Sequence, residues 1–265
     1  MSLKNFPLTN IYRKIRDDFY YKKMLKQKNQ SKYEFVYYGD SNFENERDNN
    51  DSRILQHLFK QNDIFIDIGA NIGYYSLFAK KNKLEVISIE PDHRNSNIIR
   101  QSTIENEFDI ELYETALSNF VGATKIYGGR QGSSILWGWG DIKNNYQNLC
   151  SVNTLDNILS NRFCNKRIIL KIDAEGVEFS IIKGAINFLK SDNTIILYVE
   201  HGFNENFIDD INPNFKQLFI FLFELGYKAF VDIDFETEVT INEVEKWLNN
   251  KKKDIDVINY IFKKN

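Results

Sequence analysis

The chain has 265 residues, of which 34 are Lys or Arg and 37 are Asp or Glu, so its formal net charge is −3. The lysines are spread along the chain without a basic stripe, and we therefore expect no nucleic-acid partner. With three prolines and no flexible linker, the length fits an N-terminal cap over residues 1–60 and one large α/β domain over residues 61–265.

Cysteine spacing and hydropathy indicate the compartment. Cys150 and Cys164 have no CxxC spacing and no secretory context, so we expect free thiols in a reducing environment. The first residues lack an apolar signal segment, and no stretch of the sequence has close to the ~18 consecutive apolar residues that a membrane-spanning helix needs. We therefore expect a cytoplasmic protein without a membrane span.

The first predicted elements lie in a segment rich in charged residues and Tyr. Helical periodicity covers Ile11–Leu25 and Arg53–Phe59, and a short β stretch at Tyr33–Tyr38 lies between them. Asp40–Ser52 is predicted as an exposed loop, because Asp, Asn and Glu dominate it. We take the whole segment as the cap.

From residue 63 onward, short β-rich runs alternate with helical segments. We expect strands over 64–68, 85–89, 110–116, 167–173 and 194–200, helices over 74–81, 94–107, 178–190 and 215–225, and two last strands over 227–232 and 256–262. This alternation implies right-handed crossovers and a parallel sheet, with the last two strands as an antiparallel pair at its edge. The Gly- and Trp-rich stretch 122–140 predicts a hairpin-like insertion, which is either a plain surface loop or a lid with substrate contacts.

The first strand of this series leads into an unusual glycine turn. Its apolar run ends at Asp67, Gly69 and Gly73 follow, and a helix comes directly after them. Open α/β sheets hold nucleotide-like ligands at such a turn. The dinucleotide fingerprint would need glycines where Asn71 and Tyr74 stand, and there is no Gly-Lys-Ser/Thr phosphate cradle. The turn suits a ligand with a cationic amino-acid end better than a pyrophosphate.

Three further strand ends carry polar side chains. Glu90 ends the second strand, where an acidic residue accepts hydrogen bonds from a ribose diol or, alternatively, caps the next helix. Lys171, Asp173 and Glu175 alternate at the end of a buried-looking strand, as a site that moves protons or binds cations, or as a salt-bridge cluster. His201 follows the next strand and is either a general base or a packed core residue.

Six motifs follow one another in order: Asp-Ile-Gly-Ala-Asn-Ile-Gly-Tyr-Tyr-Ser (67–76), Ile-Glu-Pro (89–91), Thr-Ala-Leu-Ser-Asn (115–119), Asn-Thr-Leu-Asp (153–156), Leu-Lys-Ile-Asp-Ala-Glu-Gly-Val-Glu (170–178) and Lys-Gly-Ala (183–185). Together they resemble the FkbM-type S-adenosylmethionine-dependent methyltransferases, a branch of the class I, Rossmann-like methyltransferases. The resemblance spans about residues 60–200. It implies a Rossmann-like sheet of about seven strands, mostly parallel with an antiparallel edge, beside a helical N-terminal cap.

The resemblance also implies roles for individual residues. The residues that would bind S-adenosylmethionine are Asp67, Gly69, Asn71, Gly73, Tyr74, Ser76, Glu90 and Ser118. Among them Glu90 would hold the ribose hydroxyls and Ser118 would lie near the adenine. The resemblance would place Asp173 and Glu175 toward the sulfonium and the acceptor. Together with Lys171 and His201 from the strand ends above, they form the candidate catalytic group, with Asp173 or His201 as the base that takes a hydroxyl proton.

We therefore expect an O-methyltransferase that acts on a sugar hydroxyl, in a nucleotide-linked sugar or a precursor of a cell-surface or capsular polysaccharide. The alternative acceptor is a non-sugar small molecule or a phosphorylated group. A dinucleotide-dependent oxidoreductase and a non-catalytic scaffold are the alternative classes. Asp173, Glu175 and Glu200 offer hard oxygen ligands that suit Mg²⁺, but their spacing alone does not establish a metal site.

Overall fold

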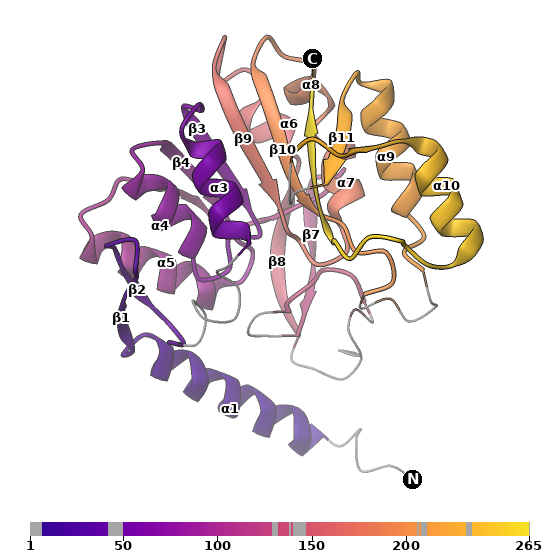
Figure 1. Ribbon diagram of the computed structural model, residues 1–265. Coiled ribbons are helices and arrows are strands. Elements are labelled where there is room, and N and C mark those ends of the chain that lie inside the picture. Colours follow the sequence, from indigo (N-terminus) through magenta and orange to yellow (C-terminus); the bar gives the residue numbers. More distant parts are fainter. Residues whose placement is uncertain are drawn as a thin grey trace.

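The computed structural model describes residues 7–41, 50–128, 132–137, 139, 147–205, 207, 211–231 and 235–264. In these residues the central element is an eight-stranded, mostly parallel sheet (Figure 1). Its strands are, in spatial order, β12 (Glu238–Val239), β11 (Lys228–Val231), β13 (Asn259–Lys263), β10 (Thr194–Glu200), β9 (Arg167–Ile172), β3 (Ile64–Ile68), β4 (Glu85–Ile89) and β5 (Glu111–Tyr113).

The order of these strands reverses between β3 and β9. From β3 the chain moves outward through β4 to β5, and it later starts again at β9 and moves the other way to β10. All of these neighbours pair in parallel, so their carboxyl ends lie at one edge of the sheet. In open α/β sheets a ligand binds at the carboxyl edge beside such a reversal. The topology therefore predicts the location of the site.

Helices cover both faces of the sheet. Side chains alternate along β3, so that Ile64, Ile66 and Ile68 pack on one face and Phe65 packs on the other. The first face is covered by α6 (Leu155–Leu159), α7 (Glu178–Lys183), α8 (Ile186–Leu189), α9 (Phe215–Glu224) and α10 (Ile241–Asn250). The second face is covered by α3 (Asp51–Phe59), α4 (Tyr74–Lys81) and α5 (His93–Glu105). Because both faces are covered, the strands are mostly apolar, apart from buried polar residues such as Asp67, Ser88 and Lys171.

Two smaller sheets flank the central one. The hairpin of β1 (Lys28–Gln30) and β2 (Val36–Tyr38) follows α1 (Pro7–Met24), a helix that runs along the lower end of the molecule in Figure 1. A second sheet is formed by β6 (Ala116–Leu117), β8 (Gln147–Asn153) and β7 (Gly122–Tyr127). The division into a cap and a main domain at residue 60 stays a prediction.

The expected fold class is confirmed, with four differences in detail. The first concerns strand number, because β12 adds a short eighth strand beside β11 at the edge of the sheet. The second concerns β13, which lies between β10 and β11 rather than at the edge, and whose residues are buried because both faces are covered. The antiparallel pairing of β11 with β13 is confirmed.

The other two differences are interruptions. The helix expected over 178–190 is broken at Gly184, where a Cβ atom would lie 2.1 Å from the carbonyl oxygen of Ser118. The strand expected over 110–116 ends at Tyr113, after which the chain leaves the central sheet and forms β6 in the second sheet. The hairpin expected after residue 122 is present as the antiparallel pair β7 and β8, and part of the 40–52 loop lies outside the described residues.

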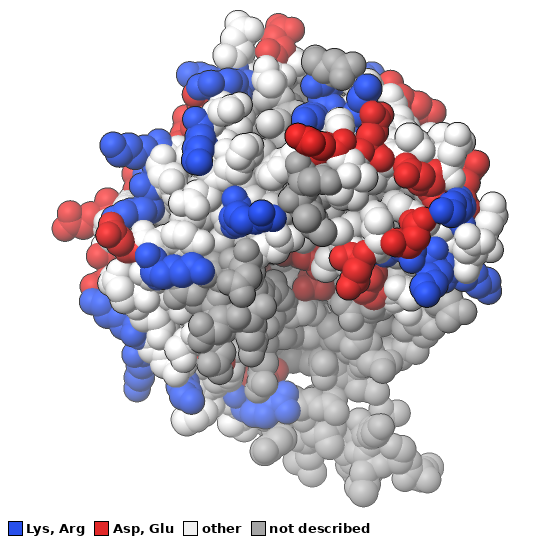
Figure 2. Space-filling view, in the orientation of Figure 1, with Lys and Arg blue, Asp and Glu red and all other residues white. Residues whose placement is uncertain are grey.

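Further expectations concern thiols and the surface. Cys150 and Cys164 are free, and Cys150 is buried. Among the described residues, no helix is both long and apolar enough to cross a membrane. Figure 2 shows acidic and basic side chains intermixed over the described part of the face in view.

Candidate functional site

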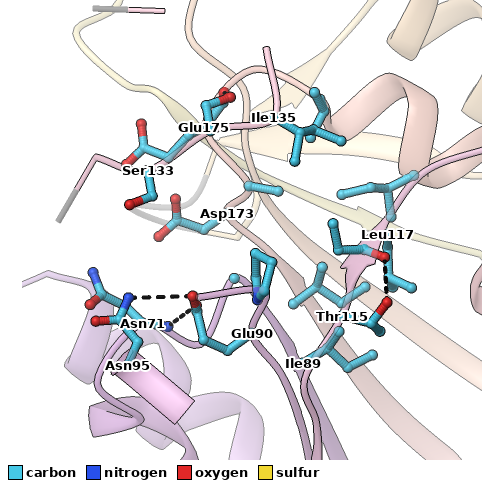
Figure 3. Close-up of a pocket in the computed structure, with 18 residues that line it drawn as sticks. Asn71, Ile89, Glu90, Asn95, Thr115, Leu117, Ser133, Ile135, Asp173 and Glu175 are labelled. Atoms are coloured by element: carbon cyan, nitrogen blue, oxygen red, sulfur yellow. Dashed lines mark hydrogen bonds between the residues drawn. The ribbon is translucent and has the colours of Figure 1, made fainter. Parts of the chain in front are cut away.

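A pocket opens at the carboxyl edge of the sheet, where the strand order reverses. The space between its lining residues, including the part open to solvent, is about 600 Å³. The residues that line it come from the ends of β3, β4 and β9, the start of α5, the segment before and within β6, and the connection between β7 and β8: Ile68, Gly69, Asn71, Ile89, Glu90, Pro91, Asn95, Thr115, Ala116, Leu117, Ser133, Ser134, Ile135, Asp173, Ala174, Glu175, Val177 and Ile181. Figure 3 shows Asn71, Glu90, Asn95 and Ser133 at one side and the apolar Ile89 and Leu117 at the other.

The turn after β3 requires glycine for two reasons. Gly69 has φ +77°, a left-handed conformation that favours glycine. A Cβ atom there would lie 1.8 Å from the carbonyl oxygen of Asp173, so any side chain would collide with the chain after β9. The amide N–H groups of Gly69 and Ala70 both donate to the Ile89 carbonyl, at 2.9 and 3.2 Å. The turn is thus fixed between β4 and β9, at the base of the pocket.

Glu90 is a buried carboxyl group that follows β4 and contacts this turn. Its Oε2 accepts from the Asn71 amide at 2.8 Å, and its Oε1 accepts from the Asp92 amide at 2.9 Å. The side chain of Asn95 donates to Oε1 at 3.3 Å. Burial raises the pKa of Glu90 from its ordinary 4.5 to about 8, although these donors favour the ionised form. The carboxyl group is therefore protonated in most molecules near neutral pH, and donors from a ligand would favour its ionisation.

A second buried polar cluster lies on the other face of the sheet. Asp67 Oδ2 accepts from Ser76 Oγ at 2.6 Å, and Ser88 Oγ donates to Ser76 Oγ at 2.7 Å. Lys171 pairs with Asp67 in the register of β3 and β9, and its ammonium lies 3.6 Å from Asp67 Oδ1 and 3.2 Å from Asp173 Oδ2. Although burial opposes its charge, the neighbouring carboxylates raise the pKa of Lys171. For Asp67 burial dominates and raises the pKa despite Lys171.

The turn after β9 carries Asp173 and Glu175 into the pocket. Asp173 accepts from Lys171 and stays partly exposed. The Glu175 carboxylate accepts from the indole N–H of Trp139 at 2.7 Å, and its carbonyl accepts from Ser134 Oγ at 2.7 Å. A Cβ atom at Gly176 would lie 2.5 Å from the Trp139 ring. These contacts hold the connection between β7 and β8 against the turn after β9.

The structure brings only part of the predicted residues together. Five of them line one pocket: Gly69, Asn71, Glu90, Asp173 and Glu175. Seven others lie outside its lining: Asp67, Gly73, Tyr74, Ser76, Ser118, Lys171 and His201. Asp67, Ser76 and Lys171 form the buried cluster on the far face, and Ser118 donates its amide N–H to the carbonyl of Asn153.

Gly73, Tyr74 and His201 also lie outside the lining. Gly73 shapes the start of α4, and Tyr74 and His201 are buried in the core. Gly73 has φ +81° at the start of α4, and a Cβ there would lie 2.9 Å from Ile99. Tyr74 packs edge-on against Phe35 in the core. His201 is 1% exposed and its ring stacks parallel to that of Phe215, so the packed alternative describes its position.

Several pocket residues are not among the site residues expected from the sequence, although Thr115, Ala116 and Leu117 belong to the motif 115–119. Thr115, Ala116 and Leu117 follow the third parallel strand, so the rule that ligands bind at carboxyl ends could have identified them. Asn95 lies five residues after Glu90 and is the third residue of α5, so its polar side chain near the start of this helix is the available signal. Ser133, Ser134 and Ile135 come from the β7–β8 connection, and no local pattern predicts their position. In the described part of the chain, no group of three or more His, Cys, Asp or Glu residues could hold a metal ion.

Comparison with known proteins gives a family match. The model described as "Methyltransferase FkbM domain" matches residues 67–229. No curated protein matches the sequence.

Solved structures resemble the chain only distantly. Precorrin-6y C5,15-methyltransferase from Geobacter metallireducens GS-15 is 16% identical, with 68% of this chain and 72% of that chain covered and a TM-score of 0.38. An rRNA methylase from Streptococcus thermophilus is 9% identical, with 81% and 96% covered and a TM-score of 0.42. The tRNA (uracil-54, C5)-methyltransferase of Pyrococcus abyssi, in complex with S-adenosyl-L-homocysteine, is 12% identical, with 66% and 35% covered and a TM-score of 0.38. Likeness at this level carries no inference about the acceptor.

Proposed function

The chain belongs to the FkbM methyltransferase family, and from this premise we propose that it transfers a methyl group from S-adenosylmethionine to a hydroxyl oxygen of a sugar. The acceptor is a nucleotide-linked sugar or a precursor of a cell-surface or capsular polysaccharide, methylated in the cytoplasm. Methyl transfer itself follows from the family, whereas the oxygen and the sugar are our proposal.

The observation that carries the proposal is the convergence of three strand ends on one pocket. Gly69 after β3, Glu90 after β4 and Asp173 after β9 all line it. A side chain at Gly69 would collide with the Asp173 carbonyl, so glycine there lets the turn after β3 pack directly against the chain after β9 and brings these two strand ends together. Glu90 is a buried carboxyl group with oxygen acceptors in the same pocket, as a ribose diol requires.

The lining residues fit S-adenosylmethionine from one end to the other. The apolar side chains of Ile89, Leu117 and Ile135 suit the adenine, and Glu90 suits the ribose. The carboxylate of Asp173 suits the positive charge of the sulfonium. When bound, this cofactor supplies a methyl group already activated by the sulfonium.

The remaining work of the protein is alignment and proton removal. Aligning the acceptor oxygen is worth several kcal/mol of the barrier, on the order expected for well-oriented reactants. Asp173 is the carboxylate in the pocket that we assign as the base for the hydroxyl proton. Lys171, held by Asp67 and Asp173 together, orients this carboxylate from the far face of the sheet.

Two features support a sugar as the acceptor. The first is the aromatic character of the β7–β8 connection, where Trp137 is 60% exposed and Trp139 is bound to Glu175 at the pocket. Aromatic faces with a polar handle pack well on molecules that carry both apolar and polar groups, as sugars do. The second is the nearly neutral net charge of the chain, which is consistent with methylation on an uncharged sugar ring.

The test is turnover with labelled S-adenosylmethionine and a panel of nucleotide sugars, with phosphorylated and non-sugar hydroxyl compounds in parallel. We expect label in a sugar, on an oxygen identified by mass spectrometry of the product. Asp173→Asn serves as the control variant, since it should lose turnover while binding S-adenosylhomocysteine as the wild type does. Label only on amines or carbons would refute O-methylation, and label only on the parallel compounds would refute the sugar.

A further inference from the structure

Asn95 lines the pocket and carries a buried side-chain oxygen without a hydrogen-bond partner among the described residues. The residue is the third of α5, and its side chain is 3% exposed. Its Nδ2 donates to Glu90 Oε1, while its Oδ1 has no hydrogen-bond partner among the described residues. Buried polar atoms in folded proteins are nearly always hydrogen-bonded, so an oxygen without a partner on a residue that lines a pocket indicates a ligand group as its partner.

The contacts of Asn95 define which ligand group would fit. Because Nδ2 donates to the Glu90 carboxylate, the amide oxygen is the end left for the pocket. An amide oxygen only accepts, so the ligand group must carry an O–H or N–H. The Glu90 carboxylate lies 3.3 Å from Nδ2 of the same amide and is itself acceptor-only when ionised. The pocket therefore presents two neighbouring acceptors, a pattern that matches two neighbouring hydroxyl groups.

We propose that Asn95 is a second recognition residue for the ribose of the cofactor, accepting one hydroxyl of the vicinal diol while Glu90 accepts the other. The inference rests on the proposed function, because it takes the occupant of the pocket to be S-adenosylmethionine. Its consequence is specificity: the pocket distinguishes a ribonucleoside from either deoxyribonucleoside through two separate side chains.

The test is calorimetric binding of S-adenosylhomocysteine and of its 2′-deoxy and 3′-deoxy analogues. The wild type should lose about three- to tenfold in affinity for each missing hydroxyl, the usual effect of one hydrogen bond. In Asn95→Ala, the penalty for one of the two hydroxyls should fall to within about twofold, and the penalty for the other should remain.

The matched control is Asn97→Ala, two residues further along α5. Asn97 bonds to His93 and Arg100 and lies outside the pocket lining, so both penalties should stay as in the wild type. Asn95→Leu, which is close to Asn in shape, repeats the test if the alanine variant does not fold.

Each outcome decides between the alternatives. If both penalties persist in Asn95→Ala, the inference is wrong. If both vanish, Asn95 acts only by orienting Glu90, and the direct contact is refuted. Unchanged binding of S-adenosylhomocysteine by Asn95→Ala refutes the inference alone. If the wild type itself does not bind S-adenosylhomocysteine, the proposed function fails and the inference fails with it.

Discussion

Glu90 makes the stability of the unliganded protein depend on pH in a direction opposite to that of most carboxyl groups. Burial raises its pKa in the folded protein to about 8, from an ordinary value of 4.5. A carboxyl group with the higher pKa in the folded state binds more protons when folded. The free energy of unfolding therefore falls as pH rises between about 4.5 and 8.

The size of this effect follows from the pKa. At pH 6 the group lies two pH units below its folded-state pKa, and each unit corresponds to about 1.4 kcal/mol. The contribution of Glu90 to the free energy of unfolding should therefore fall by about 3 kcal/mol between pH 6 and pH 9. Below pH 4.5 the group is protonated in both states, and the dependence ends.

The assay is urea unfolding of the wild type and of Glu90→Gln at pH 6, 7, 8 and 9. In the variant the buried amide has a cost of about 1–3 kcal/mol that does not change with pH, because its N–H₂ faces backbone donors such as the Asn71 amide. Its pH profile should lack the decline of about 3 kcal/mol, since the titrating group is gone. All other titrating groups are common to both proteins. Parallel pH profiles for the two proteins would refute the reasoning.

The same ionisation should appear when ligand binds. At pH 7 a group with a pKa of about 8 is protonated in about nine molecules of ten. Ribose hydroxyls that donate to the carboxylate favour its ionised form, so binding of S-adenosylhomocysteine should release up to about 0.9 proton at pH 7. Calorimetry in buffers with different ionisation enthalpies measures this number. Zero release by the wild type, or equal release by Glu90→Gln, would contradict the assignment.

Three further predictions concern the turns and the buried cluster. Gly69→Ala should lower the free energy of unfolding in urea by at least about 3 kcal/mol, because the side chain adds both backbone strain and a collision. The control is Gly226→Ala, where φ is +84° but no atom lies within 4 Å of the added Cβ, and it should lose only about 1 kcal/mol. Equal losses in the two variants would show that the collision is absent. Lys171→Met should lower the free energy of unfolding by about 3–5 kcal/mol, because it leaves the buried Asp67 carboxyl group without its cation. In a double-mutant cycle, adding Asp67→Asn should recover part of this loss. Additive losses would show that the two residues are not coupled. Trp139→Phe keeps a ring but removes the indole N–H that donates to Glu175, so it should lower the free energy of unfolding by about 1–2 kcal/mol in thermal or urea unfolding. An unchanged stability would show that this hydrogen bond contributes nothing.

Much of the fold could be predicted from local patterns. The strands at 64–68, 85–89 and 194–200 have the expected bounds, because a buried parallel strand is a short apolar run bounded by turn residues. The break at Gly184 and the interior place of β13 could not be predicted in this way. Both depend on contacts with residues distant in sequence, Ser118 for Gly184 and the strands on either side for β13.

The candidate site divides in the same way. The residue pattern alone indicates that Gly69, Glu90 and Asp173 follow strands of one parallel sheet, whose carboxyl ends meet at one edge. The fold places β3 between β4 and β9 and selects which side chains at that edge face the pocket. Asp67 and Lys171 pair on the far face, although they belong to the same motifs. Asn95 and the 133–135 segment reach the pocket because α5 and the β7–β8 connection pack beside it, and no local periodicity records a contact made across the fold.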